Sequence, residues 1–145
     1  VHNHTLWRKD PIPETVRIEF EAKASADGDI RFEIFGDGEH HESGYVLVYN
    51  AWGGVVHVVS RLDEHSPQRV TVPVTSPIDP KATYRMAVVR TDASLRWFVD
   101  GTLLLELIDE KPLRGHGHDR FGLGGWSREV QFDNVRVFAL TGEVP

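Results

Sequence analysis

"TVRIEFEAKASADGDIRFEIF", residues 15–35, is the stretch of sequence that decides the fold. From Val16 to Ala22 every second residue is apolar, and the residues between them are charged. A period of two places these two sets on opposite faces of an extended strand. The alternation returns from Ile30 to Ile34, after the turn sequence Ala-Asp-Gly-Asp. The stretch therefore predicts two half-buried β-strands joined by a tight turn.

Strand character continues along the chain, and clusters of Gly, Pro, Asp and Ser separate one segment from the next. Asp100 and Gly101 lie between two apolar runs and predict a tight hairpin turn. The best helix candidate, a turn at Asp79 and Pro80, is too short to count as a helix. Beyond residue 35, the segments expected to form strands are 44–50, 55–62, 68–74, 83–91, 94–100, 102–108, 120–125 and 130–140.

Ten short strands joined by turns require two layers, because each sheet has an apolar face that the other must cover. We therefore predict an all-β fold, an antiparallel two-sheet jelly-roll sandwich that forms a single domain over residues 1–145. In the last segment, Val130 and Phe132 follow one phase of the alternation. The next apolar pair, Val135 and Val137, follows the other. This change of phase predicts a β-bulge at Asp133 and Asn134.

The composition argues against several classes of function. The formal net charge is −6, and no cluster of basic residues offers a stripe for phosphates, so we expect no nucleic-acid partner. The chain has no Cys, which excludes disulfides, thiolate nucleophiles and Cys-ligated zinc. No stretch approaches the roughly 20 apolar residues that cross a bilayer, so no membrane insertion is expected.

Three segments resemble the concanavalin A-like lectin/glucanase superfamily: "SGYVLVYNAWGG" (43–54), "YRMAVVRTDASLRWFVDGTLLLEL" (84–107) and "FGLGGWSREVQFDNVRVFAL" (121–140). More narrowly, the segments resemble the 3-keto-disaccharide hydrolase-like and laminin-G-like bacterial sandwich domains. The resemblance implies a jelly roll, a carbohydrate ligand and a secreted or cell-surface location. The Glu-x-Asp-x-x-Glu string of laminarinase-type hydrolases and the Gln-Ile-His string of alginate lyases are both absent. The sequence therefore shows no recognised catalytic motif of this superfamily.

The same resemblance implies a structural calcium ion between the N-terminal segment and the last strand. Asp133 matches the carboxylate of that site, and backbone carbonyl oxygens would complete the coordination. The alternative is that Asp133 and Asn134 only satisfy backbone donors at the bulge. Apart from this ion, no cofactor is expected.

A candidate binding site lies in "YNAWGGVVHVVSRLDEH", residues 49–65. Regular alternation over 54–63 would place His57, Val59, Arg61 and Asp63 on the polar, solvated face of the strand and Val56, Val58, Ser60 and Leu62 on its apolar, core face. Sugar binding needs a flat aromatic ring beside planar polar groups. The residues that supply these groups are Tyr49, Asn50, Trp52, His57, Arg61 and Asp63.

Trp126, in a second Gly-Trp element, would form an aromatic clamp if it lay at the same end of the sandwich as Trp52. Gly pairs beside a Trp permit positive φ, so each element can be a turn that presents its indole at a rim. In the competing interpretation the aromatic rings fill the core, and Arg61 and Asp63 form a cross-strand ion pair. The sequence leaves both interpretations open.

We therefore predict a non-catalytic carbohydrate-binding module, part of a larger protein, with a glycan or polysaccharide as its partner. One alternative is a glycoside hydrolase or lyase with unfamiliar catalytic residues. Another is a structural or protein-interaction module, which an exposed apolar patch without an aromatic-lined concavity would favour.

Overall fold

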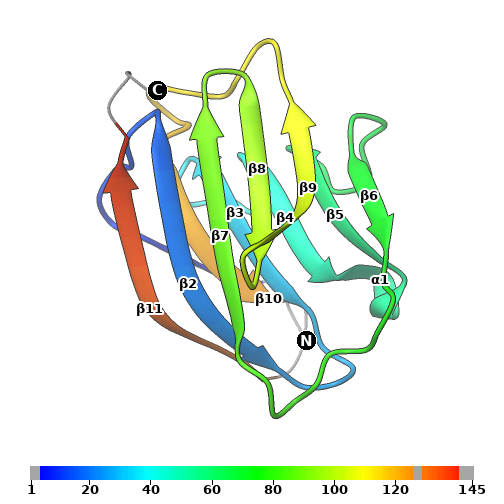
Figure 1. Cartoon of the computed structure of the whole chain (residues 1–145). Helices are drawn as coiled ribbons and strands as arrows, with labels where there is room; N and C mark the ends of the chain where they lie inside the picture. The colour runs from blue at the N-terminus through cyan, green and yellow to red at the C-terminus, as the bar shows by residue number, and fades with distance from the viewer. Residues whose placement is uncertain (1–3, 126–128, 141–145) are drawn as a thin grey trace.

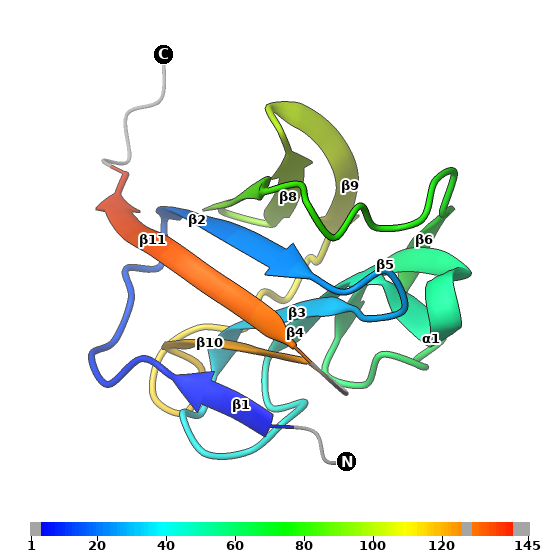
Figure 2. The same ribbon diagram turned by 90° about the horizontal axis from the view of Figure 1, so that it is seen from below.

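The computed structural model describes residues 4–125 and 129–140, which form two antiparallel sheets of a jelly-roll sandwich (Figure 1). The six-stranded sheet has the order β1 (His4–Trp7), β10 (Arg120–Gly125), β3 (Ile30–Gly36), β4 (Tyr45–Asn50), β5 (Val56–Arg61) and β6 (Val70–Pro73). The five-stranded sheet has the order β11 (Val130–Ala139), β2 (Val16–Ala24), β7 (Tyr84–Thr91), β8 (Ser94–Val99) and β9 (Thr102–Ile108). Figure 2 shows the two layers from one end.

All ten predicted strands are confirmed, and the described residues contain one more, β1. Its four residues are too few to show an alternation, and Leu6 is 78% exposed, so no apolar pattern marks it. Trp7 holds this edge strand to the sheet. A Cβ atom at Gly36 would lie 2.4 Å from the Trp7 ring, and one at Gly122 would lie 2.8 Å from it. The two glycines therefore let the indole pack directly on the backbone of β3 and β10.

The apolar phase of β2 forms the centre of the core, as its alternation predicts. Its inward residues are buried along the whole strand, and Phe20 meets Phe32 of the opposite sheet edge-to-face at 5.0 Å between ring centroids. Phe32 in turn meets Trp97 of β8 at 5.4 Å. These contacts bury large aromatic areas between the layers, and such burial is the main driving force for folding.

Two predictions about the local backbone, a hairpin turn and a β-bulge, are confirmed. Asp100 and Gly101 join β8 to β9 with φ values of 50° and 83°, as the two central positions of a type I′ turn require. In β11 the register to β2 shifts between Asp133 and Arg136, and Asn134 has a φ of 54°. This bulge lets Val130 and Phe132 before it and Val137 after it pack against the core, whereas Val135 is 42% exposed.

Over residues 4–125 and 129–140, the predicted absence of a helix holds except for one turn, α1 (Ala51–Gly54), between β4 and β5. Trp52 and Gly53 inside α1 have left-handed backbone angles, with φ values of 55° and 74°. Figure 1 shows α1 at the end of β4, at one corner of the six-stranded sheet. No helix among the described residues is long and apolar enough to cross a membrane.

Both faces of β3 and β4 are buried, although a sandwich strand usually has one solvated face. The inner face joins the inter-sheet core. On the outer face, Val46 and Val48 form a second apolar cluster with Ala51 and Val58. The outer face of the six-stranded sheet is therefore covered by parts of the chain itself, and the candidate site lies there.

Candidate functional site

A pocket of about 500 Å³ opens over the outer face of the six-stranded sheet, beside α1. Its walls come from the β2–β3 turn, the β3–β4 loop, α1 and the loop after β5, and β3 contributes to its floor. The lining residues are Asp27, Gly28, Asp29, Arg31, His41, Glu42, Asn50, Trp52, Gly53, Glu64 and His65. We call this concavity the Trp52 pocket.

The Trp52 indole forms the aromatic rim of this pocket and is 38% exposed. Its Nε1 donates a hydrogen bond to Oε2 of Glu64 at 3.1 Å, and the ring stacks on His65 at 5.2 Å between centroids. The Arg69 guanidinium lies over it, with Cζ 5.6 Å from the ring centroid. The left-handed turn that the Gly pair suggested therefore does present the indole at a rim, and three side chains fix its orientation.

Asn50 lies directly before this turn, with a φ of 66° and an exposed fraction of 4%. Its Nδ2 donates to the carbonyl oxygen of Gly28 at 2.7 Å, which ties the β2–β3 turn to α1. Oδ1 of the same amide is buried and accepts no hydrogen bond from the described residues. An unsatisfied buried acceptor costs free energy, so this atom is a candidate for contact with a bound polar group.

Below the rim, Glu33 is fully buried on the outer face of β3. Its carboxylate accepts hydrogen bonds from the Thr5 hydroxyl (2.7 Å), the backbone N–H of Glu42 (2.7 Å) and Nδ1 of His41 (3.0 Å). Burial alone would raise the pKa of Glu33, but these hydrogen bonds outweigh it and lower the pKa below its usual value. Arg31, which is 2% exposed, donates to the Thr5 hydroxyl at 2.9 Å.

Three side chains of types that can bind a metal ion meet where the β3–β4 loop touches the loop after β5. They are His41, Glu42 and Glu64. One ligand atom from each lies within 4.8 Å of the others. The loops are joined by the backbone N–H of Glu64, which donates to Oε2 of Glu42 at 2.9 Å. Sequence reasoning missed this group because its members are distant in the chain and carry no spacing signal. It also missed Arg31 and Glu33, because alternation on β3 assigns them to a solvated face.

Tyr49 and His57, two predicted site residues, point away from the pocket. His57 is 5% exposed and stacks on Tyr49 at 4.1 Å between centroids, on the side of the inter-sheet core. Its Nδ1 accepts the backbone N–H of Asn50 at 3.0 Å, and burial lowers the pKa of His57. The expectation that His57 lies on the solvated face of its strand is therefore wrong. Val58 and Ser60, expected to face the core, face outward instead and are buried.

Arg61 and Asp63 do not form the expected cross-strand ion pair. Nε of Arg61 lies 2.8 Å from Oδ2 of Asp109, which also accepts the Tyr45 hydroxyl at 2.7 Å. Asp63 accepts the backbone N–H of His65 at 2.9 Å and closes a turn. Leu62, between them, has a φ of 69°, which ends the strand and breaks the alternation. Neither residue lines the Trp52 pocket.

Two further predicted residues remain untested. Trp126 lies outside the described residues, so the predicted clamp with Trp52 stays a prediction. Oδ1 of Asp133 accepts the backbone N–H of Asn134 at 2.8 Å, and Asn134 donates from Nδ2 to Glu21 at 2.6 Å. Calcium binding at Asp133 stays a prediction as well.

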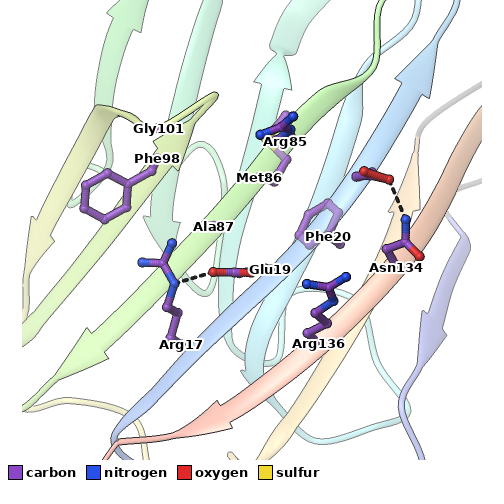
Figure 3. Close-up of a pocket in the computed structure, with 11 residues that line it drawn as sticks. Arg17, Glu19, Phe20, Arg85, Met86, Ala87, Phe98, Gly101, Asn134 and Arg136 are labelled. Atoms are coloured by element: carbon purple, nitrogen blue, oxygen red, sulfur yellow. Dashed lines mark hydrogen bonds and ion pairs between the residues drawn. The ribbon is translucent and has the colours of Figure 1, made fainter.

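A second concavity, of about 540 Å³, lies on the outer face of the five-stranded sheet (Figure 3). We call it the arginine groove. Arg17 and Glu19 of β2 form an ion pair across it at 2.6 Å, and Arg85 and Arg136 stand on the neighbouring strands. Phe20 and Phe98 are its aromatic lining residues. None of the described residues of the predicted binding site lines this groove.

Comparison with known proteins finds similar structures but no related sequence. No family model matches the chain, and no curated protein matches it. A tetrameric galectin from the ball sponge Cinachyrella sp. is similar, with a TM-score of 0.69, 14% identity and 93% of this chain and 99% of that chain covered. Sheep galectin-11 in complex with glycerol has a TM-score of 0.68 and 10% identity over 95% of this chain and 98% of that chain.

The carbohydrate-binding module CBM66 from Bacillus subtilis is similar too, with a TM-score of 0.65 and 16% identity over 86% of this chain and 74% of that chain. At these identities the likeness establishes the fold, a lectin-like jelly roll. The narrower resemblance to 3-keto-disaccharide hydrolase-like and laminin-G-like domains stays a prediction.

Proposed function

We propose that this protein is a non-catalytic glycan-binding module and that the Trp52 pocket is its binding site. The observation that carries the proposal is a partly exposed indole at the rim of a concave pocket otherwise lined mainly by polar side chains. Ligand sites are concave and combine apolar surface with a few oriented polar groups. The similar structures include galectins and a carbohydrate-binding module, which supports a sugar ligand on this fold.

The chemistry of the lining fits a pyranose. The C–H face of the sugar would stack on Trp52, because an indole gives a large flat apolar surface at low conformational cost. Arg31 can donate hydrogen bonds to the hydroxyl groups of a sugar, and Oδ1 of Asn50 can accept one. The indole is already fixed by Glu64 and His65, so little side-chain entropy is lost on binding. The affinity is nevertheless weak, because every hydroxyl must be removed from water.

A titration of neutral and acidic oligosaccharides by calorimetry or NMR tests this proposal. We expect a subset to bind in the micromolar to millimolar range, and Trp52→Ala to weaken binding at least about tenfold, the equivalent of 1.4 kcal/mol. Arg136→Ala in the arginine groove is the matched control and should leave the affinity unchanged. Loss of binding in Arg136→Ala alone would move the site to the other sheet. Absence of any ligand better than millimolar would refute the function.

Glycoside hydrolysis is a second candidate because Glu42 and Glu64 approach each other inside the pocket. Retaining glycosidases hold two carboxyl groups about 5–5.5 Å apart. Here each carboxylate already accepts a hydrogen bond from the protein, Glu42 from a backbone N–H and Glu64 from Trp52. Assays for new reducing ends on the same oligosaccharides separate the two functions. Turnover that disappears in Glu64→Gln, with ligand binding kept, would establish the enzyme.

A further inference from the structure

The group His41, Glu42 and Glu64 combines one imidazole with two carboxylates from two loops that meet over the sheet. All three side chains are partly buried, and their ligand atoms lie within 4.8 Å of one another. We propose that these three side chains bind one divalent transition-metal ion of the zinc type. The site stands without the glycan proposal, because its ligands are complete in the absence of a sugar.

The imidazole of His41 is already oriented for a metal ion. Its Nδ1 lies 3.0 Å from Oε2 of the buried Glu33. Oε2 of Glu33 also lies 3.8 Å from Nε of the Arg31 guanidinium, and a carboxylate paired with a cation accepts hydrogen bonds, so Nδ1 of His41 is the donor in this contact. Nε2 is then left with its lone pair, 3.9 Å from Oε1 of Glu42. A histidine that binds a metal ion characteristically donates its other N–H to a carboxylate in this way.

The two carboxylates are held from behind in a similar manner. Oε2 of Glu42 accepts the backbone N–H of Glu64 at 2.9 Å, and Oε2 of Glu64 accepts Nε1–H of Trp52 at 3.1 Å. Oε1 of Glu42 lies on the side of the imidazole, 3.9 Å from Nε2 of His41. Ligands of tetrahedral zinc lie about 2.0–2.2 Å from the metal and therefore about 3.4 Å from one another, so ligand atoms up to 4.8 Å apart must approach by at most about 1.4 Å.

Charge and ligand type select the kind of ion. Two carboxylates and a neutral imidazole give a charge of −2, which a divalent cation balances. An imidazole ligand favours zinc and other transition metals, whereas calcium and magnesium prefer a shell made only of oxygen. Three protein ligands leave a fourth position for water.

Calorimetric titration of the chelator-treated full chain with zinc chloride, without sugar, tests the proposal. We expect one zinc ion per chain, at least about tenfold weaker binding of calcium, and a change in tryptophan fluorescence because Trp52 donates to Glu64. Glu64→Gln should lose the zinc site while keeping an acceptor for Trp52. Glu33→Gln should weaken binding about 10–100-fold, the usual cost of removing a carboxylate that orients a ligand.

The control is a chain in which His116 and His118, a histidine pair far from the site in the sequence, are both changed to Ala. It should bind zinc as the unchanged chain does. His41→Ala provides a second ligand variant, and circular dichroism checks that each variant folds. A stoichiometry of zero, or zinc binding that survives both His41→Ala and Glu64→Gln, would overturn the site. Loss of zinc binding in the control chain would assign it to the loop that holds His116 and His118.

Discussion

The two outer faces of the sandwich carry concavities of nearly equal size but of different construction. The Trp52 pocket encloses about 500 Å³ and the arginine groove about 540 Å³. In the pocket, loops cover the sheet, and the polar groups beneath them, Arg31 and Glu33, are buried and hydrogen-bonded to several segments. In the groove, charged side chains stand on strands in contact with water, as Arg17 and Glu19 do. Volume therefore does not distinguish the two faces, but the degree to which polar groups are fixed does.

Glu33→Gln should give the largest effect on stability, because it breaks the polar network under the pocket. The substitution removes a carboxylate that balances the buried Arg31 guanidinium and puts an amide N–H among donors from Thr5, His41 and Glu42. Removing one partner of a buried charged pair costs about 3–5 kcal/mol. We expect the free energy of unfolding, measured by urea titration, to fall by about 3 kcal/mol.

Glu19→Gln in the arginine groove is the matched substitution on the other face. The Arg17–Glu19 ion pair is short, at 2.6 Å, but its side chains are 40% and 34% exposed. Exposed pairs contribute about 0–1 kcal/mol, so we expect a loss of less than about 1 kcal/mol in the same titration. Equal losses in Glu33→Gln and Glu19→Gln would show that the two faces are not built differently.

A smaller effect is expected at Trp52, where the pocket rim has a strained backbone. A residue with a side chain at a φ of 55° pays about 1–2 kcal/mol that glycine does not pay. Trp52→Gly should therefore be more stable than Trp52→Ala by about 1 kcal/mol in thermal or urea unfolding. In an ordinary helical turn the order would be the reverse, because glycine is the poorer helix former. Both variants should lose the glycan affinity proposed for the indole.

The alternation in the sequence was sufficient to predict the sandwich, because period-two burial is a local property of each strand. The Gly pair after Trp52 also predicted the left-handed turn that presents the indole at the pocket rim. The alternation failed for Glu33, which it assigns to water but which the β3–β4 loop covers. It failed again at Leu62, where a positive φ ends the strand and separates Arg61 from Asp63. Loop packing and single backbone reversals depend on contacts between distant residues, so no local pattern reports them.

The smallest expected effect is a dependence of stability on pH that arises behind the pocket rim. Nδ1 of His57 accepts the N–H of Asn50, and burial lowers the pKa of His57 in the folded chain. As the pH falls below about 6.5, the unfolded chain binds a proton that the folded chain does not, so the free energy of unfolding decreases. The decrease ends once the pH reaches the lower pKa of the folded state.

His57→Gln isolates this contribution, because the glutamine oxygen can still accept the N–H of Asn50 but does not titrate. We expect melting temperatures of the unchanged chain to fall more steeply between pH 7.5 and 5 than those of His57→Gln. His40, whose pKa is raised by its hydrogen bond to Asp37, titrates in both chains and cancels in the difference. If the melting temperatures of the two chains fell equally with pH, His57 would not be the group that makes stability depend on pH.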